Sequence, residues 1–582
     1  MNVIRTAVGT LLLAWAASAQ AECKIRAIEL PVRMDGPRAI AMLGINGTQI
    51  PLIVDSGAFF STLTRASAEE LGLTLQRLPE GATVGGLAGN MVHPRKTTVK
   101  TVQLLNSQIP DIDFLVGGND SGLGGMGVLG RNILSMLDTE YDLAHGMIRF
   151  VKLTGDCDNT NMAYWAGDTP VSEVKLLSSP TPGRPPIRAR LQLNGHEVTA
   201  LFDTGASTIV SLDAAHKAGL QDADLRDNST TYGVGRGQVK FWTASFDTVS
   251  LGGETVRHNR LGVSDFEGRD FDMLVGIDFF LSHRVYVSSE NQRMFFTYNG
   301  GPVFARNVEL KAEGAAPAAS AAADTLSADE LFRRGTASLS RKDFAAALAD
   351  LDRACALEPG NARFHLARAE VFRNLKNGPK AQAELDAALA LDPKLDEARL
   401  LRATSTPREA DHARALQDLG ILDDTLTPQS NMRRSLAQAY DQLGAPAMAI
   451  KQWTLWIENH RDDIRLPAAR NGRCWTRTEA NIELKEAMAD CDDAIDDESD
   501  NASFHGSRGW LQLRLDQPAK ARVDFDRALK IKPDAAWSLY GRGVARLRLG
   551  ETAAAQADLA AARKAEPKID AQVKDAGFEP AS

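Results

Sequence analysis

The chain has 582 residues, too many for one hydrophobic core, and hydrophobic and charged residues make up 44% and 24% of it. This balance is typical of folded globular domains and excludes a fully disordered or fibrous chain. Lysine and arginine number 66 against 75 aspartate and glutamate residues, for a net charge of −9. Because no overall basic field is present, we expect no nucleic-acid partner.

The first residues have the features of an export signal. Arg5 supplies the positive charge, residues 8–17 are apolar, and residues 19–21 form a small-x-small cleavage site. We therefore predict a signal peptide over residues 1–21 and a periplasmic or secreted protein. A lipoprotein anchored at Cys23 stays an alternative, although the residue before it is not small. No later apolar run approaches the roughly 20 residues that span a bilayer, so no membrane span is expected.

A long internal repeat fills the N-terminal half of the chain. Each copy has a strand-like run, an Asn-Gly turn, an apolar strand that ends in an acidic tripeptide, and a helix-like stretch. A glycine-rich turn and an apolar pair followed by glycine come later in each copy. The repeat predicts two mostly β lobes in tandem, over residues 37–155 and 185–305.

The two acidic tripeptides carry the chemistry. They are Asp55-Ser56-Gly57 and Asp203-Thr204-Gly205, each followed by alanine. One such tripeptide is a weak signal, and aspartate commonly forms turns after strands, but a turn-forming role does not explain the duplication. The joint pattern resembles the clan of aspartic proteases. It is most similar to the retropepsin type, in the bacterial exported form that fuses both lobes in one chain.

The resemblance implies that Asp55 and Asp203 are catalytic. They would face each other at the floor of a cleft and activate one water molecule, with one proton shared between them. The hydroxyl groups of Ser56 and Thr204 would each brace the opposite loop. The same comparison assigns Gly57 and Gly205 to a tight turn beneath the carboxylates.

The glycine-rich turns are candidate flaps that would close over an extended polypeptide substrate. The candidate flap residues are Gly85, Gly86, Leu87, Gly233, Val234 and Gly235. The alternative is an ordinary hairpin loop in each lobe. Phe59 and Phe60 are bulky where related proteins often have small residues, so the first lobe's substrate subsites are expected to differ.

A second repeat, of about 34 residues, follows an Ala-rich linker predicted over residues 306–326. Pro359 and Pro393 are separated by this period, and small residues recur at fixed positions before each proline. The pattern resembles the tetratricopeptide repeat and predicts a helical array over residues 327–570, joined flexibly to the lobes. Four repeat units are clear, whereas residues 397–428 fit the pattern poorly.

Five cysteines permit at most two disulfides in an oxidising compartment. Cys474 and Cys491 lie at facing positions of one helical repeat, so we expect a disulfide, with two buried thiols as the alternative. Cys23 and Cys157 flank the first lobe and are the second candidate pair, which leaves Cys355 unpaired. No Cys-x-x-Cys or His-Glu-x-x-His occurs, so neither a metal site nor a cofactor is expected.

The sequence thus predicts a multidomain protein, a mainly-β two-lobed acid protease fold followed by an all-α solenoid. The expected function is exported aspartic endopeptidase, with the array recruiting substrate or partner proteins. The array could instead only stabilise the lobes. The main alternative for the whole chain is a non-catalytic scaffold that binds peptide and protein partners. A carbohydrate hydrolase is a weaker one, because such enzymes hold their two carboxylates farther apart.

Overall fold

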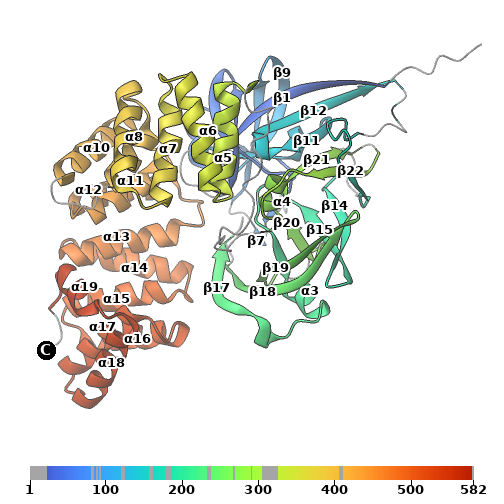
Figure 1. Ribbon diagram of the computed structural model, residues 1–582. Helices are drawn as coiled ribbons and strands as arrows, with labels where there is room; N and C mark the ends of the chain where they lie inside the picture. The colour runs from blue at the N-terminus through green and yellow to red at the C-terminus, as the bar shows by residue number, and fades with distance from the viewer. Residues whose placement is uncertain are drawn as a thin grey trace, which may run out of the picture.

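A computed structural model describes residues 23–79, 84–86, 89–90, 93–118, 125–155, 157, 162–178, 185–232, 238–266, 269–289, 291–304, 325–405 and 411–579. These residues form two β lobes and a helical array beside them (Figure 1). The expected mainly-β two-lobed fold followed by an all-α solenoid is confirmed. The predicted signal peptide and most of the predicted linker lie outside the described residues.

Lobe 1 is a small barrel that the pairing of β2 with β8 closes. Its elements are β2 (Arg38–Ile45), β3 (Thr48–Val54), β4 (Thr62–Leu63), α1 (Arg65–Glu70), β5 (Gln76–Arg77), β8 (Arg95–Leu104), β9 (Ser107–Val116), β10 (Gly127–Leu129) and α2 (Arg131–Leu134). A two-stranded hairpin, β6 (Gly85–Gly86) and β7 (Gly89–Asn90), lies between β5 and β8. Strand β10 runs parallel to β3 and antiparallel to β4.

Lobe 2 repeats this topology, with β14 paired to β18. Its elements are β14 (Arg188–Leu193), β15 (His196–Phe202), β16 (Ile209–Ser211), α3 (Leu212–Lys217), η2 (Asp222–Asp224), β17 (Arg226–Tyr232), β18 (Gln238–Leu251), β19 (Glu254–Ser264), β20 (Met273–Val275) and α4 (Ile277–Ser282). Strand β20 runs parallel to β15 and antiparallel to β16, as β10 does in lobe 1. The internal repeat of the sequence is therefore a repeat of structure.

The Asn-Gly dipeptides make the tight turns that fix strand register ahead of each acidic tripeptide. Asn46 and Gly47 have φ of 49° and 92°, and Asn194 and Gly195 have φ of 50° and 80°. Two successive residues with positive φ are what a two-residue hairpin turn requires, and Asn-Gly meets that requirement at the lowest cost.

Strands of both lobes join in one sheet between them. It contains β1 (Lys24–Asp35), β12 (Met147–Thr154) and β11 (Asp138–Asp142) of lobe 1, then β21 (His283–Ser288), β22 (Arg293–Tyr298) and β13 (Ser172–Lys175) of lobe 2. Strand β11 pairs antiparallel with β21, so the lobes meet edge to edge. The short helix η1 (Leu143–His145) follows β11.

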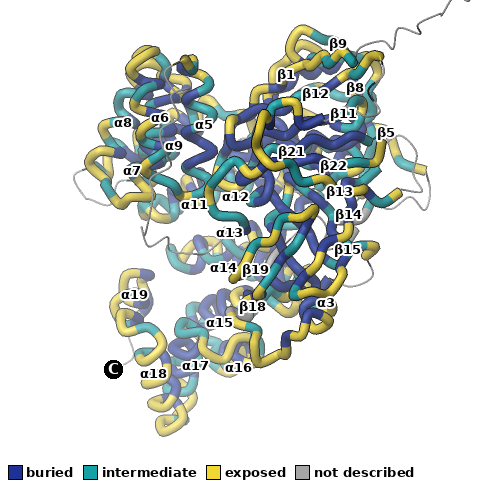
Figure 2. Tube along the Cα trace, turned by 45° about the vertical axis from the view of Figure 1, so that its right-hand side comes forward, coloured by how far each residue is buried: buried dark blue, intermediate teal, exposed yellow. Residues whose placement is uncertain are grey.

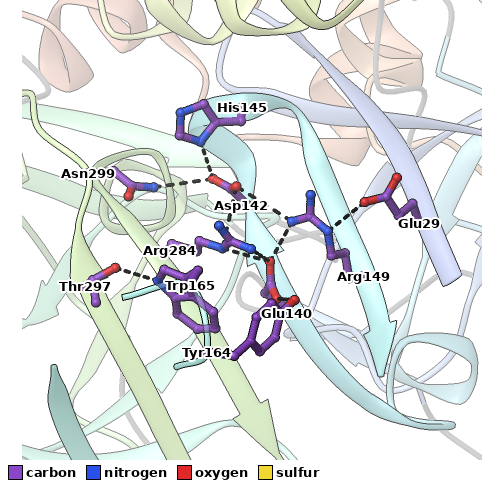
Figure 3. A network of polar contacts seen from close by, with 10 residues as sticks. All are labelled: Glu29, Glu140, Asp142, His145, Arg149, Tyr164, Trp165, Arg284, Thr297 and Asn299. Atoms are coloured by element: carbon purple, nitrogen blue, oxygen red, sulfur yellow. Dashed lines mark hydrogen bonds and ion pairs between the residues drawn. The ribbon is translucent and has the colours of Figure 1, made fainter. Parts of the chain in front are cut away.

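A network of charged groups ties this sheet together (Figure 3). The fully buried carboxylate of Glu140 accepts hydrogen bonds from Arg149 Nη1 at 2.6 Å and from Arg284 Nε at 2.9 Å. The Tyr164 hydroxyl donates to the same carboxylate. Because Glu140 lies in lobe 1 and Arg284 in lobe 2, the network fixes the lobes relative to each other, and burial of an unpaired carboxylate would be costly.

The C-terminal region consists of antiparallel helix pairs. The helices are α5 (Ala328–Ser340), α6 (Phe344–Leu357), α7 (Ala362–Asn374), α8 (Gly378–Leu391), α9 (Asp396–Thr404), α10 (His412–Thr425), α11 (Met432–Gln442), α12 (Pro446–Asn459), α13 (Leu466–Ala480), α14 (Leu484–Asp497), α15 (Ala502–Arg514), α16 (Pro518–Ile531), α17 (Ala536–Arg548), α18 (Thr552–Ala565) and α19 (Ile569–Asp575). The stretch 397–428, which fits the sequence pattern poorly, also contains a helix pair, α9 and α10.

Two periodic features hold the pairs together. Small residues permit close helix contact: a Cβ on Gly509 would lie 2.8 Å from the Phe525 ring. The second feature is a ladder of arginines, each of which forms an ion pair with an acid on the next helix. The ladder pairs are Arg334–Asp350, Arg368–Glu384, Arg402–Asp418, Arg473–Asp490, Arg508–Asp524 and Arg542–Asp558. Arg402 preserves the ladder where the proline and alanine pattern fades.

The array packs directly on the lobes, contrary to the flexible join expected from the sequence. Ala337 of α5 is fully buried in the same apolar cluster as the lobe cores. Thr336 Oγ1 accepts a hydrogen bond from the Met34 amide at 3.2 Å, and Arg341 Nη1 donates to the Leu281 carbonyl at 2.9 Å. Helix α5 therefore contacts both lobes, and Figures 1 and 2 agree that the first helices lie beside them. Burial of apolar surface therefore attaches the array to the lobes, which the composition of the predicted linker could not indicate.

Two disulfides are present. Cys23 is bonded to Cys157 and connects the start of β1 to the segment after β12. Cys474 is bonded to Cys491 and joins α13 to α14. Cys355 is a free, buried thiol.

Candidate active site

Asp55 and Asp203 stand at equivalent places in the two lobes. Asp55 follows β3 and Asp203 follows β15. The Asp55 amide donates to the Leu129 carbonyl at 3.0 Å, and the Asp203 amide donates to the Val275 carbonyl at 2.9 Å. The closing strand of each lobe therefore holds its aspartate, because parallel pairing with β10 or β20 continues one residue past the strand.

The hydroxyl groups of the two tripeptides cross between the lobes. The Ser56 amide donates to Thr204 Oγ1 and the Thr204 amide donates to Ser56 Oγ, both at 3.0 Å. Ser56 Oγ donates to the Phe202 carbonyl at 3.1 Å, and Thr204 Oγ1 donates to the Val54 carbonyl at 2.9 Å. Both hydroxyl side chains are fully buried. This reciprocal set of four hydrogen bonds fixes the position of each aspartate relative to the other lobe.

The glycines of the tripeptides make room for the opposite carboxyl group. A Cβ on Gly57 would lie 2.4 Å from Cγ of Asp203, and a Cβ on Gly205 would lie 2.4 Å from Cγ of Asp55. Each glycine lies in a tight turn, closed by hydrogen bonds from the Ala58 amide to the Asp55 carbonyl and from the Ala206 amide to the Asp203 carbonyl, both at 3.3 Å, and neither glycine has a positive φ. Glycine is needed here because each carboxyl group packs on the other lobe's backbone.

The two carboxyl groups are in hydrogen-bond contact and their surroundings differ. Asp203 Oδ1 accepts from the amides of Gly57 at 3.2 Å and Gly205 at 2.8 Å. Asp55 Oδ1 accepts from the Ala58 amide at 2.7 Å. Burial, the charge of Asp203 and the hydrogen bond to it raise the pKa of Asp55 well above its ordinary value. The pair therefore retains one proton at a pH where two separate aspartates would both be ionised.

In each lobe a hydroxyl side chain and an Asn or Asp side chain hold the loop that carries the catalytic aspartate. The sequence did not lead us to predict these contacts. In lobe 1, Ser61 Oγ donates to Asn132 Oδ1 at 2.7 Å and accepts from the Gly130 amide at 3.0 Å. In lobe 2, Thr208 Oγ1 donates to Asp278 Oδ1 at 2.5 Å and accepts from the Gly276 amide at 2.9 Å. The internal repeat contains the pattern that could have predicted them. A hydroxyl residue, Ser61 or Thr208, comes three or four residues after each tripeptide, and Asn132 or Asp278 comes two residues after the glycine that ends each copy.

Two further buried groups lie near the pair without an equivalent in lobe 2. Arg131 is buried, which lowers its pKa, while the charges of Asp55 and Asp203 act to raise it. Burial likewise raises the pKa of the Tyr141 phenol, whose ring packs edge-on against Phe280 at 5.2 Å. The position of Arg131 after the closing glycine is occupied by Ile277 in lobe 2, so one lobe alone brings a cation toward the carboxylates.

The candidate flaps are described only in part. Gly85 and Gly86 pair with Asn90 and Gly89 in the β6–β7 hairpin. Leu87, Gly233, Val234 and Gly235 lie outside the described residues. Their role in covering substrate stays a prediction for both lobes.

The array reaches lobe 1 beside these loops. Asp462, between α12 and α13, contacts Arg65 Nη1 at 3.0 Å and His93 Nδ1 at 3.2 Å. Asn431 Nδ2 donates to the Gly125 carbonyl at 3.0 Å, just before β10. The middle helices of the array therefore contact lobe 1 at the start of α1, at His93 and just before β10.

Within the described residues, no three His, Cys, Asp or Glu side chains are grouped so that they could hold a metal ion. None of the described helices has the length and apolar character needed to cross a bilayer. The groups that surround Asp55 and Asp203 are amides, hydroxyls and carboxyls. This set can share, donate and accept protons.

Comparison with known proteins identifies both regions of the chain. A family model for aspartyl protease matches residues 41–133 and 189–279, and a tetratricopeptide repeat model matches residues 338–404. The UBA domain-containing protein Mud1 of Schizosaccharomyces pombe is 31% identical over 160 residues, which cover 25% of this chain and 47% of that protein. The chain thus spans about half the length of this curated relative.

Solved structures similar to each region are also found. The crystal structure of aspartic proteinase from Irpex lacteus is 15% identical and covers 47% of this chain and 97% of that chain, with a TM-score of 0.32. A tetratricopeptide repeat protein from Parabacteroides merdae is 18% identical and covers 43% and 98%, with a TM-score of 0.35. The aspartyl protease model thus matches part of each β lobe, and the tetratricopeptide repeat model matches the first part of the helical array.

Proposed function

We propose that the protein is an aspartic endopeptidase whose nucleophile is a water molecule activated between Asp55 and Asp203. The observation that carries this proposal is the pair itself. Two carboxyl groups from different lobes are in hydrogen-bond contact, and four reciprocal hydrogen bonds hold them there. A carboxyl pair with one shared proton supplies an acid and a base at the same place.

The contacts favour one distribution of roles. The backbone amides of Gly57 and Gly205 stabilise negative charge on Asp203, and the raised pKa of Asp55 favours its protonated form. In the proposed reaction, the ionised carboxylate takes a proton from water as the water oxygen bonds to the peptide carbonyl carbon. The protonated carboxyl gives its proton to the carbonyl oxygen. As this tetrahedral diol collapses, the C–N bond breaks and the leaving amine receives a proton from the pair. One diol hydroxyl gives its proton back to the pair as the product carboxyl forms.

The same contact argues against glycoside hydrolysis. Retaining enzymes of that class keep their carboxyl groups about 5 Å apart, and inverting enzymes keep them farther apart, so that the sugar or a water molecule fits between them. Here each carboxyl group packs on the glycine beside the other, and the two are hydrogen bonded. A peptide substrate approaches such a pair from above and needs no gap between the two acids.

We further propose that the protein is exported to the periplasm or secreted and that the array recruits substrate or partner proteins. The signal-like residues 1–21 and the disulfides Cys23–Cys157 and Cys474–Cys491 support export, because disulfides persist in oxidising compartments. Stacked helix pairs present an extended surface suited to binding polypeptide, which supports recruitment.

The test is digestion of a diverse peptide library by the purified chain, read by mass spectrometry, alongside Asp55→Asn and Asp203→Asn. Asp222→Asn, an exposed aspartate of lobe 2, is the matched control. We expect cleavage by the unchanged protein and the control, and a loss of about 1,000-fold or more in either dyad variant. The rate should fall as rising pH removes the shared proton, at a higher pH than an ordinary aspartic acid would give.

Absence of cleavage in the unchanged protein across the pH range, with cooperative unfolding in all variants, would contradict the proposal. Retained binding of peptide or protein partners in that case would favour a scaffold. Cleavage that survives both dyad substitutions would assign the activity to other residues or to a contaminant.

A further inference from the structure

Asn431 joins the helical array to the strand that holds Asp55. It is buried in the loop between α10 and α11. Its Nδ2 atom donates to the Gly125 carbonyl at 3.0 Å. Gly125 lies two residues before β10, and Leu129 at the end of β10 accepts the hydrogen bond of the Asp55 amide. The array therefore contacts this strand just ahead of its first residue.

The side chain of Asn431 is held in one orientation. Nε2 of His460 lies 2.9 Å from Oδ1 of Asn431, so the amide oxygen faces the imidazole and Nδ2 faces Gly125. His460 is itself buried, and its ring stacks on Trp456 with 4.5 Å between the ring centres. A side chain held at both ends in this way is preorganised for its contact with lobe 1.

Lobe 2 fastens the equivalent point without the array. Asp272 precedes β20 as Met126 precedes β10, and its Oδ2 atom accepts a hydrogen bond from the Thr199 amide at 2.8 Å. The residue of lobe 1 that corresponds to Thr199 is Pro51, which has no amide hydrogen to donate. Met126 in turn has no carboxylate to accept one. Lobe 1 therefore cannot form this internal bond, and Asn431 contacts it at the same strand end.

The backbone contacts at this point are the same in both lobes. The Met126 amide donates to the Pro51 carbonyl at 3.0 Å, and the Met126 carbonyl accepts from the Thr64 amide at 3.3 Å. In lobe 2 the corresponding distances at Asp272 are 2.7 and 2.8 Å. The lobes thus share one backbone frame, and the side-chain bond added to it comes from within lobe 2 but from the array for lobe 1.

Strand β10 is packed tightly between its neighbours. Gly127 is paired with Leu52 of β3 and with Leu63 of β4. A Cβ at Gly127 would clash with the Thr62 carbonyl, so β10 lies directly against the chain of β4. Because the end of β10 holds the Asp55 amide, a displacement of β10 also displaces Asp55. Misplacement of a catalytic group by about 1 Å can slow a reaction about 100-fold.

We propose that Asn431 is a positioning residue for Asp55, and that it supplies from the array the side-chain hydrogen bond that Asp272 supplies within lobe 2. The proposal rests on the proposed function, because it gives the array a part in the rate of that reaction. Other contacts of the array with lobe 1, from Asp462 to Arg65 and from Thr427 to Glu70, end on α1 and attach the array without reaching β10.

The test compares kcat and KM of Asn431→Ala with those of two controls, on one peptide that the unchanged protein cleaves. Asn459→Ala removes an array amide that donates to the Leu455 carbonyl of its own helix at 2.7 Å. Asp462→Ala removes a contact of the array with α1. We expect kcat of Asn431→Ala to fall about 5- to 50-fold with KM changed less than about 2-fold, because a loosened aspartate slows the reaction of bound substrate. Both controls should keep kcat.

The pH profile distinguishes positioning from a loss of folded protein. Burial, the charge of Asp203 and the hydrogen bond to it raise the pKa of Asp55. A looser pair weakens these effects, so kcat of Asn431→Ala should begin to fall at a lower pH than kcat of the unchanged protein. A variant that is merely destabilised has fewer active molecules, and its profile keeps its shape wherever it stays folded.

Lobe 2 provides the design of a rescue. Pro51→Thr together with Met126→Asp introduces into lobe 1 the amide and carboxylate that Thr199 and Asp272 pair in lobe 2. Added to Asn431→Ala, the two changes should restore most of the lost kcat.

Three results would overturn the proposal. The first is an unchanged kcat in Asn431→Ala. The second is an equal loss in Asp462→Ala, which would assign the effect to attachment of the array. The third is a loss that keeps the pH profile and is not restored by Pro51→Thr with Met126→Asp, which would make Asn431 a structural contact.

Hydrogen exchange separates this proposal from the enzymatic one, because it needs no cleavage. In Asn431→Ala we expect faster amide exchange at Asp55 and at residues 127–129, with Asp203 and residues 273–275 of lobe 2 unchanged. Faster exchange there in a protein that cleaves no peptide would reject the endopeptidase and keep the connection from the array to Asp55. Unchanged exchange at Asp55 and residues 127–129 would overturn the positioning role whatever the activity.

Discussion

Lobe 1 and lobe 2 hold their aspartates with the same contacts but surround them differently. Each contributes a hydroxyl that crosses to the other lobe, and each contributes a glycine on which the opposite carboxyl group packs. Farther from the pair the lobes differ: the Arg131 guanidinium of lobe 1 lies over the Phe59 ring, whereas Ser207 and Ile277 of lobe 2 line a cavity.

The array follows the same asymmetry. Helix α1 of lobe 1 contacts it through Arg65 and Glu70. The described ion pairs of α3 in lobe 2, from His216 and Lys217, stay within that lobe. The difference teaches that the chemistry of the pair demands symmetry only within hydrogen-bonding reach, and that the rest of each lobe is free to specialise.

The largest effect on the symmetric contacts of the aspartate pair should come from adding one methyl group at Gly57 or Gly205. Gly57→Ala and Gly205→Ala each place a Cβ against the opposite carboxyl group, so one aspartate must move. We expect each to lower kcat by about 100- to 1,000-fold, because misplacement of a catalytic group by about 1 Å has an effect of that order. Peptide cleavage assays measure it. Gly360→Ala, at a glycine with ordinary φ and open space around it, tests the cost of an alanine alone. A large activity difference between the Gly57 and Gly205 variants would contradict equal roles.

The crossed hydroxyl groups give the next largest effect. Ser56→Ala and Thr204→Val each leave a buried amide without its acceptor, so each should lower the free energy of unfolding by about 1–3 kcal/mol. Urea unfolding followed by circular dichroism measures the loss.

The conservative variants Ser56→Thr and Thr204→Ser keep the hydroxyl and serve as controls. The double variant Ser56→Ala/Thr204→Val should cost less than the sum of the single ones, because both belong to one network. Additive costs would show that the two crossings act independently.

The sequence predicted the parts of the fold that repeat. Three features have a local physical cause: the Asn-Gly turns, the tripeptides at strand ends and the small residues that recur in the helices. They could therefore be predicted without knowing which distant segments pack against them. The hydroxyl crossings follow from the duplication, because a two-fold arrangement places Ser56 opposite Thr204.

The contacts between distant segments could not be read in this way. The role of Gly57 depends on a carboxyl group from the other lobe, which no local propensity encodes. The Glu140–Arg284 pairing depends on the register of β11 against β21. Packing of α5 depends on an apolar surface that both folded lobes provide, which the sequence of α5 and the linker does not encode. The Ala-rich linker therefore led us to expect that the array and the lobes are independent of each other.

Glu370, on the wall of the cavity between the lobes and the array, should make the stability of the protein depend on pH. The pKa of Glu370 in the folded protein, about 7, lies above its ordinary value of 4.5. Its favourable contribution to folding is therefore fully present below pH 4.5 and is lost as the pH rises through 7. Glu370→Gln stays neutral, so it should raise the free energy of unfolding by about 1–2 kcal/mol at pH 8 and change it little at pH 4.

Urea unfolding at the two pH values measures this difference, with Glu486→Gln as the exposed control. Equal stability of Glu370→Gln and the unchanged protein at pH 8 would mean that the cavity hydrates this carboxylate as well as bulk water does.

The smallest expected effect comes from removing the ion pairs between Asp462 of the array and lobe 1, which lobe 2 does not share. Asp462→Ala removes the pairs with Arg65 and His93, both partly exposed, and should cost less than about 1 kcal/mol. Its consequence should be local, with faster amide hydrogen exchange at residues 93–96 and 460–465. Asp222→Ala, which removes a more exposed ion pair within lobe 2, should leave exchange in the array unchanged. Because α5 is buried against both lobes, losing Asp462 cannot release the array; global loosening of lobe 1 in Asp462→Ala would show that α5 is the weaker attachment.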